Sequence, residues 1–175
     1  MTRPQPNEAA SYYSRYIDLV TGDEIVPAMK DQFGETVRFL EGISEEQSLK
    51  AYAPGKWTIR EVLNHVNDGE RLFLGRAVWF ARGFQDPLPG FDQDIAARYA
   101  NANETSWAGL VEEFKTVRAA TISFFEHMPE EAWSRSGVAS DNPVTVRAIA
   151  YIIAGHVTHH LNVLNDKYLS TDYTE

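Results

Sequence analysis

The sequence predicts an all-α protein, a four-helix bundle with a long loop between its second and third helices. Four long segments carry apolar residues three and four positions apart, as one face of a helix requires. No segment alternates apolar and polar residues between hairpin turns, so the evidence for strands is weak. The 175 residues contain no internal repeat or low-complexity linker. We therefore expect one domain over residues 1–175.

Boundary signals place each helix in turn. The four predicted helices cover about residues 23–42, 58–84, 106–127 and 144–169, with short helical turns at 44–49 and 129–133. The second helix has the strongest start signal, because Thr58 can cap it and Glu61 completes a capping box. The third helix ends before Pro129, where His127 can cap the carbonyl end.

The connection over residues 83–105 is long for neighbouring helices in a bundle. It contains the run Pro87-Leu88-Pro89-Gly90-Phe91, and long loops of this kind often carry function. We expect a crossover or a lid over one end of the bundle. The alternative is that its apolar residues simply seal the core; these are Phe91, Ile95 and Tyr99.

Composition limits the classes of function. With 25 acidic and 16 basic residues, the formal charge is −9, which repels nucleic acid and anionic membrane surfaces. Cysteine is absent, so any metal site must use nitrogen and oxygen ligands. The first residues lack the apolar core of a signal peptide, and no apolar run approaches the roughly 20 residues of a membrane span. We therefore expect a cytoplasmic protein.

Three of the five histidines lie within five residues of the fourth predicted helix. His156 and His160 are four residues apart, so both fall on the apolar face about one turn from each other, while His159 lies at its margin. Imidazole is the commonest protein ligand of divalent transition metals. His65, at the edge of the apolar stripe of the second helix, is the best third ligand. The alternative is a set of hydrogen-bonded core histidines.

Three segments together resemble the DinB-like superfamily of metal-dependent, YfiT-like proteins. They are residues 53–65 (APGKWTIREVLNH), residues 81–83 with 87–91 (ARG and PLPGF) and residues 147–160 (RAIAYIIAGHVTHH). The resemblance covers about residues 12–169. It implies a four-helix bundle that holds a divalent ion, often nickel or zinc, with three histidines. Matched residue by residue, these are His65, His156 and His160.

Three imidazoles would leave an open position on a zinc or nickel ion, as in catalytic sites. Such an ion could lower the pKa of a bound water for hydrolysis, or deprotonate a substrate thiol. No catalytic residue stands out. The weak candidates are Glu61, Asp68, Glu70 and His159. In structural terms, Glu61 would complete the capping box, Asp68 would be a solvated charge and Glu70 a buried acid paired with an arginine. His159 lies beside the expected ligands.

These observations favour a metal-dependent enzyme with a small-molecule substrate. It would be a hydrolase, or a transferase that uses a low-molecular-weight thiol, as some relatives in the family do. One alternative is a non-catalytic metal-binding protein or a homodimer formed through exposed aromatic residues such as Trp79 or Trp107. Another is a metal-free bundle with a polar interior. Serine hydrolase chemistry is not supported, because the chain has no G-x-S-x-G motif.

Overall fold

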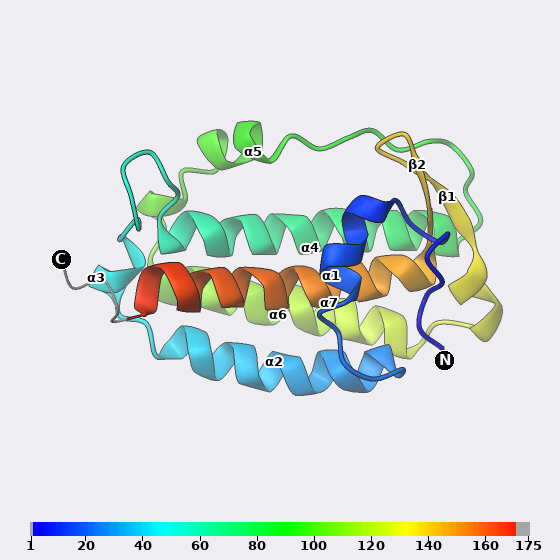
Figure 1. Ribbon diagram of the computed structural model, residues 1–175, viewed down its shortest axis with the longest axis horizontal. Helices are drawn as coiled ribbons and strands as arrows, with labels where there is room; N and C mark the ends of the chain where they lie inside the picture. Colours follow the sequence, from blue (N-terminus) through cyan, green and yellow to red (C-terminus); the bar gives the residue numbers. More distant parts are fainter. Residues whose placement is uncertain (1, 171–175) are drawn as a thin grey trace.

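The computed structural model describes residues 2–170 and confirms the predicted bundle (Figure 1). Its long helices are α2 (Ile25–Glu41), α4 (Ile59–Ala81), α6 (Trp107–Glu126) and α7 (Val146–Val163). The chain runs in one direction along α4 and α6 and in the other along α2 and α7 (Figure 1). The consecutive helices α4 and α6 are therefore parallel neighbours that need a crossover between them.

Shorter elements lie outside the four long helices. They are η1 (Ser11–Tyr13), α1 (Ser14–Ile17), α3 (Glu45–Ser48), α5 (Gln93–Ala100), η2 (Ala102–Glu104), η3 (Glu130–Ser134) and the π-helical η4 (Leu164–Leu169). The predicted turns at 44–49 and 129–133 are confirmed as α3 and η3. The N-terminal α1, which packs against α7, was not predicted, because four residues are too few to show a helical period.

The loop over residues 83–105 is the crossover. It runs back along the outside of the bundle and carries α5 beside α4 (Figure 1). The alternative that its apolar residues seal the core is wrong, because Phe91, Ile95 and Tyr99 are 42%, 53% and 77% exposed. The helix α5 has no buried residue, since it lies outside a bundle whose core α4 already fills.

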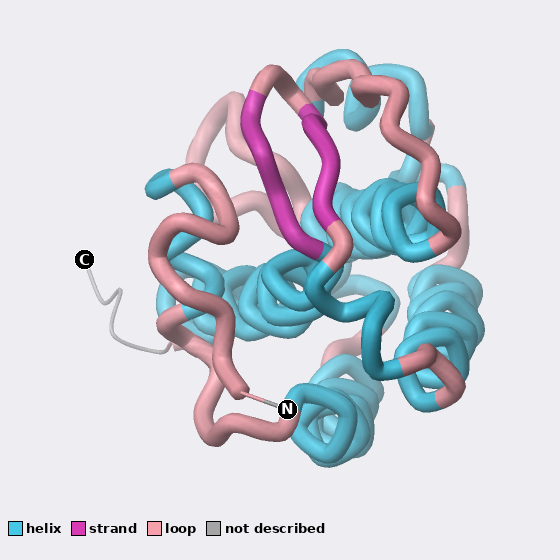
Figure 2. The backbone as a smooth tube through the Cα atoms, turned by 90° about the vertical axis from the view of Figure 1, so that its right-hand side faces the viewer, coloured by secondary structure: helices cyan, strands magenta, loops and turns pink. Residues whose placement is uncertain are grey.

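A two-stranded hairpin was missed from the sequence. Strand β1 (Ser136–Ala139) pairs antiparallel with β2 (Asn142–Thr145) and crosses one end of the bundle (Figure 2). The turn residues Ser140 and Asp141 have φ angles of 52° and 61°, as a two-residue hairpin turn requires, but they lack the usual glycine signal. The fourth helix consequently begins at Val146, not near Val144 as predicted.

The start of α4 follows the predicted chemistry, and α7 has a cap that was not predicted. Thr58 and Glu61 form the capping box of α4 through both reciprocal hydrogen bonds. The Thr145 side chain caps α7 by accepting a hydrogen bond from the Ala148 N–H at 3.0 Å.

Trp107, expected as an exposed aromatic, is 4% exposed and donates through Nε1 to the Leu40 carbonyl, so it cannot supply a dimer surface. Within residues 2–170, no helix has the length and apolarity to cross a membrane.

Candidate metal centre

The structure brings together the three histidines that the sequence selected as ligands. His65 lies on α4, and His156 and His160 lie on α7. The Nε2 atom of His156 is 3.1 Å from that of His65 and 3.1 Å from that of His160. One ligand atom from each of the three rings lies within 4.8 Å of the others. Three nitrogen atoms from two facing helices thus converge on one point.

Two glycines allow close packing around the histidines. Gly69 follows His65 by one turn of α4, and a Cβ atom there would lie 2.9 Å from Cε1 of His156. The missing side chain of Gly69 therefore leaves the space that the His156 ring occupies. A Cβ atom on Gly155 would lie 1.9 Å from the carbonyl oxygen of Tyr16, so α1 can pack directly against α7 only because of this glycine.

Aromatic side chains surround the three imidazoles. The Tyr16 ring meets His156 edge-on at a centroid distance of 5.3 Å, and Phe73 meets the same ring at 6.0 Å. Trp57 lies 5.1 Å from His65. His156 itself is only 4% exposed. These contacts limit rotation of the rings and hold them in a poorly hydrated environment, where charged groups are disfavoured.

This environment keeps the three histidines neutral. Burial lowers the pKa of His65 to about 4, although the Asp94 carboxylate opposes the shift. Burial and the neighbouring imidazole of His65 lower the pKa of His156 to about 3. The pKa of His160 is also lowered, by burial first and by His156 second. At neutral pH each ring therefore carries one unprotonated nitrogen that can bind a metal.

The cluster fits a divalent cation better than it fits a set of hydrogen bonds. A ring nitrogen of neutral histidine is either one donor or one acceptor. The Nε2 atom of His156 therefore cannot make an ideal hydrogen bond to both neighbours, although both lie 3.1 Å away. Two nitrogen ligands at about 2.0–2.1 Å from a tetrahedral ion lie roughly 3.3 Å apart. The distance of 3.1 Å from the His156 Nε2 atom to each of its two neighbours is close to this value of about 3.3 Å.

The three carboxylates weighed as catalytic candidates have other partners. The Oε2 atom of Glu61 accepts the Thr58 N–H at 2.7 Å in the capping box. Glu70 forms a buried ion pair with Arg118 at 2.8 Å. Asp68 is part-buried, accepts a hydrogen bond from Asn64 and lies 3.6 Å from Arg71. These contacts favour a structural role over a catalytic one for each carboxylate. Asp68, expected as a solvated charge, also pairs with Arg71.

His159 has a different environment. It is partly exposed and its ring lies 5.4 Å from that of Tyr16, beside the three converging histidines. Together with His160 and Asp94 it borders an open cavity of about 390 Å³. His127 lies elsewhere, and its Nδ1 bonds to the Ser123 carbonyl at 2.8 Å, which confirms the capping interpretation.

Cavities flank the histidines on both sides. The 390 Å³ cavity reaches His160 and is bordered by Gln93 of α5. A second cavity, of about 120 Å³, reaches His65 and His156 and is also bordered by Gln93. A small molecule can therefore approach the cluster from solvent. Sequence reasoning missed several residues here, namely Tyr16, Gly69, Arg76, Asp94 and Ser140.

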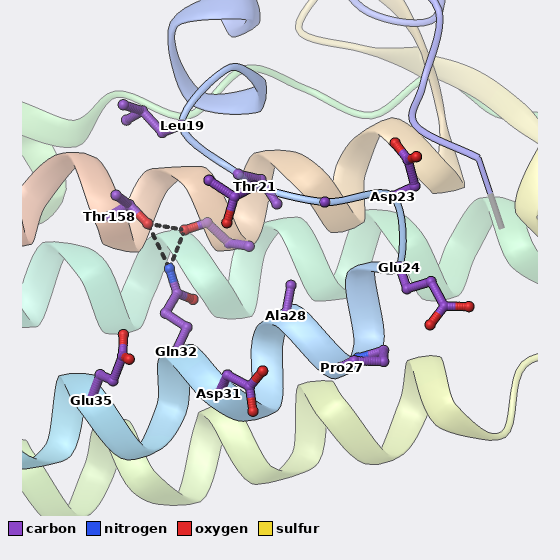
Figure 3. A pocket seen from close by; sticks show the side chains of 13 residues that line it. Leu19, Thr21, Asp23, Glu24, Pro27, Ala28, Asp31, Gln32, Glu35 and Thr158 are labelled. Carbon is purple, nitrogen blue, oxygen red and sulfur yellow. Dashed lines mark hydrogen bonds between the residues drawn. The ribbon is translucent and has the colours of Figure 1, made fainter.

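A larger cleft lies elsewhere in the molecule. It has a volume of about 600 Å³ and lies between α2 and the segment before it, with acidic side chains such as Asp31 and Glu35 along its edge (Figure 3). At its floor, Gln32 donates to the Ala154 carbonyl and the Thr158 hydroxyl. Ala154 and Thr158 are each two residues from His156, on the other side of α7. This cleft does not reach the histidines.

A four-helix bundle with parallel α4 and α6 and three converging histidines defines the class of this protein, a helical bundle with a candidate metal centre. The chain belongs to the DinB superfamily, whose family model matches residues 28–164. The matched span includes His65, His156 and His160. The predicted family is thereby confirmed.

Similar proteins carry names that concern metal-dependent hydrolysis. A protein of Oceanobacillus iheyensis named "Putative metal-dependent hydrolase" is 27% identical over 135 residues, 75% of this chain and 74% of that protein. The structure of YfiT from Bacillus subtilis, described as a probable metal-dependent hydrolase with an unusual four-helix bundle topology, matches with a TM-score of 0.71 and 13% identity. That match covers 93% of this chain and 89% of YfiT.

A mycothiol-dependent maleylpyruvate isomerase shares the fold as well. Its structure matches with a TM-score of 0.69 and 13% identity. The match covers 84% of this chain but 60% of the isomerase chain, so this chain spans less than two thirds of that protein. At this level of identity, both solved structures support the fold of the bundle.

Proposed function

We propose that this protein is a metal-dependent hydrolase that binds one divalent ion, nickel or zinc, through His65, His156 and His160. The convergence of their Nε2 atoms is the observation that carries the proposal. The name of the relative from Oceanobacillus iheyensis supports hydrolysis as the reaction class. The lowered pKa values of all three ligands keep their lone pairs available at neutral pH.

A divalent ion supplies positive charge that lowers the pKa of water bound to it and polarises a substrate carbonyl. The side chains of the protein do the rest. Tyr16 and Phe73 orient the ring of His156, Trp57 orients that of His65, and these aromatic rings exclude water from that side of the cluster. His159 borders the open cavity, and burial together with Arg15 lowers its pKa, so its ring is neutral and can accept a proton.

The substrate in this proposal is a small molecule. The two cavities that reach the histidines have volumes of about 390 and 120 Å³, which suit a metabolite and not a polymer. The net charge of −9 disfavours nucleic acid and anionic membranes as partners. A homodimer would leave both cavities free only if its interface lay away from α5.

Transfer of a low-molecular-weight thiol is the second candidate. Three nitrogen ligands leave room for a substrate thiol, and the chain has no cysteine that could compete for the ion. The mycothiol-dependent maleylpyruvate isomerase, which matches over 84% of this chain, is thiol-dependent by its name. In this reaction the ion would favour the thiolate form, and a general base would matter less.

Protein without a histidine tag, loaded with nickel or zinc, tests the proposal. We expect about one equivalent of ion by elemental analysis and its loss in His65→Ala and His160→Ala. The loaded protein is then assayed against panels of esters, amides and lactones, and separately for thiol addition to electrophiles. Activity that requires both the ion and His160 supports the proposal. Turnover of esters, amides or lactones would indicate a hydrolase, and thiol addition to electrophiles would indicate a thiol transferase.

Two results would contradict it. Protein that takes up no ion after incubation with nickel or zinc would leave a metal-free helical bundle. One equivalent of ion that raises the melting temperature, together with no turnover in either panel and no spectral change when azide is added to the cobalt form, would indicate a closed structural ion. The protein would then be a non-catalytic metal-binding or interaction protein.

A further inference from the structure

The 120 Å³ cavity has a charged residue at the end remote from the histidines. It is bordered at one end by His65 and His156 and at the other by Arg76 and Ser140. On α4, His65 and Arg76 are eleven residues apart, which places both on one face of the helix and separates their Cα atoms by about 17 Å along its axis. The face between them is bordered by Gly69, Leu72 and Phe73.

Arg76 is buried but lacks an acidic partner. Its residue exposure is 5%, and within residues 2–170 it takes part in no ion pair. Its Nη2 donates to the Pro89 carbonyl at 2.8 Å and to the Ser140 hydroxyl at 3.0 Å. Its Nε is buried without a hydrogen-bond partner. A buried guanidinium with an unused donor is costly unless an anion completes its bonding.

The other buried arginines show how unusual this is. Arg118 pairs with Glu70, and Arg60 pairs with Glu45. Both therefore have a carboxylate within the chain, whereas Arg76 has only neutral acceptors. The charge of Arg76 is thus available to a ligand that enters the cavity.

The hairpin holds the guanidinium in place. Ser140 sits in the β1–β2 turn with a φ of 52°, a conformation that L-residues adopt at some cost. The turn is fixed to the crossover loop, because the Ser140 N–H donates to the Leu88 carbonyl at 3.1 Å. Arg76 is therefore positioned by two elements far apart in the sequence before any ligand arrives. Such fixed donors bind an anion with little loss of conformational entropy.

We propose that Arg76 binds a carboxylate group of the substrate while the reacting end of the same molecule reaches the histidine cluster. This proposal rests on the proposed function and narrows its substrate to an elongated small molecule with a terminal carboxylate. A single guanidinium in a narrow cavity walled by Phe73, Leu72 and Tyr13 suits one singly charged group. Arg76 then determines specificity, and the metal ligands carry the chemistry.

The first arm of the test uses metal-free protein. The Nε–H signal of Arg76 is followed by nitrogen-15 NMR while hexanoate, or the uncharged 1-hexanol, is added. We expect a saturable shift of this signal with hexanoate and none with 1-hexanol. If the Arg76 signal does not move with hexanoate, the inference is wrong, whether or not the protein binds metal.

The second arm uses the cobalt form, in which a thiolate that reaches the ion gives a charge-transfer band. Mercaptocarboxylates of increasing chain length are compared with mercaptoalcohols of the same length, for example 6-mercaptohexanoate with 6-mercaptohexanol. At the best length we expect the carboxylate to bind at least about tenfold tighter, as a charge-assisted bond allows. Equal affinity within every pair would overturn the inference while leaving the metal site intact.

Variants then test whether Arg76 causes the preference for the carboxylate over the alcohol. Arg76→Met should remove this preference, and Arg76→Lys should keep part of it because the positive charge remains. Arg71→Met is the matched control, since Arg71 lies on the same helix, is exposed and pairs with Glu113. It removes the same charge and should leave the preference unchanged. A preference that survives in Arg76→Met would contradict the inference, and an unchanged cobalt spectrum shows that this variant has kept its fold.

Discussion

The polar cluster around Arg118 and the cluster of three histidines are both buried in the bundle, but they differ in what completes them. In the first, Arg118 donates to Glu70 through Nε and Nη2 at 3.1 and 2.8 Å, and to Gln32 through Nη1 at 2.8 Å. Its positive and negative charges come from the chain itself. In the second, His65, His156 and His160 present neutral nitrogen atoms to one another at close range.

The difference separates stability from function. A buried ion pair supplied by the chain has both of its charges once the protein folds, and removing one partner leaves an uncompensated charge. A cluster of converging neutral acceptors becomes complete only when a cation arrives from outside. We therefore expect changes in the first cluster to destabilise the protein and changes in the second to abolish metal binding with little effect on the metal-free fold.

The largest expected effect is on stability, from Arg118→Met. Arg118 is fully buried, so the variant leaves the Glu70 carboxylate without its partner inside the bundle. We expect a loss of about 3–5 kcal/mol in the free energy of unfolding. Urea denaturation measures it. The double variant with Glu70→Met should recover much of the loss, and a single variant as stable as wild type would remove the contrast between the clusters.

His156→Ala should abolish the stabilisation that metal confers. For wild type, an ion at one hundred times its Kd adds about 2.7 kcal/mol to the free energy of unfolding. The melting temperature should then rise by about 5–10 °C in a protein of this size. His127→Ala is the matched control, because His127 is an exposed cap outside the cluster. A metal-induced rise that persists in His156→Ala would place the ion elsewhere.

A glycine pair on α4 sharpens the comparison further. In Gly69→Ala the new methyl group would lie 2.9 Å from the His156 ring, so the ring must shift and metal affinity should fall about tenfold, or 1.4 kcal/mol. Gly75 has open space around it. Gly75→Ala should therefore keep the affinity and stabilise the helix by about 0.5–1 kcal/mol. Calorimetric metal titration distinguishes the two, and equal affinities would show that the ring need not stay in place.

The smallest expected effect is that of mild acid on metal affinity. Protons compete with the ion only below the pKa of each ligand, and burial lowers this pKa to about 4 in His65 and about 3 in His156. Lowering the pH from 7.5 to 5.5 should therefore change the Kd less than about threefold. Three histidines with the ordinary pKa near 6.5 would lose roughly a thousandfold over this range. Titration at both pH values decides between these outcomes.

Much of the fold could be predicted because it depends on local signals. The apolar period and the Thr58–Glu61 capping box fix the start of α4 to within a residue. The hairpin could not be predicted in this way. Its strands have four residues each, one of them contains Pro143, and its turn uses Ser140 and Asp141 where Asn-Gly is usual. Packing across the end of the bundle, not local preference, stabilises it.

The candidate site, like the fold, was predicted where it depends on local signals and missed where it depends on tertiary contacts. A helical period places His156 and His160 on one face, and His65 faces them because α4 and α7 pack together. The residues around them depend on tertiary contacts that no period reveals. Tyr16 reaches the site from α1, Asp94 lies on the crossover, and Ser140 meets Arg76 only in the folded chain. Gly69, one turn from His65, and Gly155, directly before His156, are local signals of close packing that sequence reasoning missed.

Anomalous X-ray diffraction from crystals grown with nickel or zinc would show directly whether His65, His156 and His160 bind the ion. The account predicts one strong anomalous peak at about 2.0–2.2 Å from the Nε2 atoms of His65, His156 and His160, with at least one further position open towards a cavity. A peak at other residues would contradict it. So would the absence of a peak in crystals soaked with excess metal, with the Nε2 atom of His156 still 3.1 Å from those of His65 and His160.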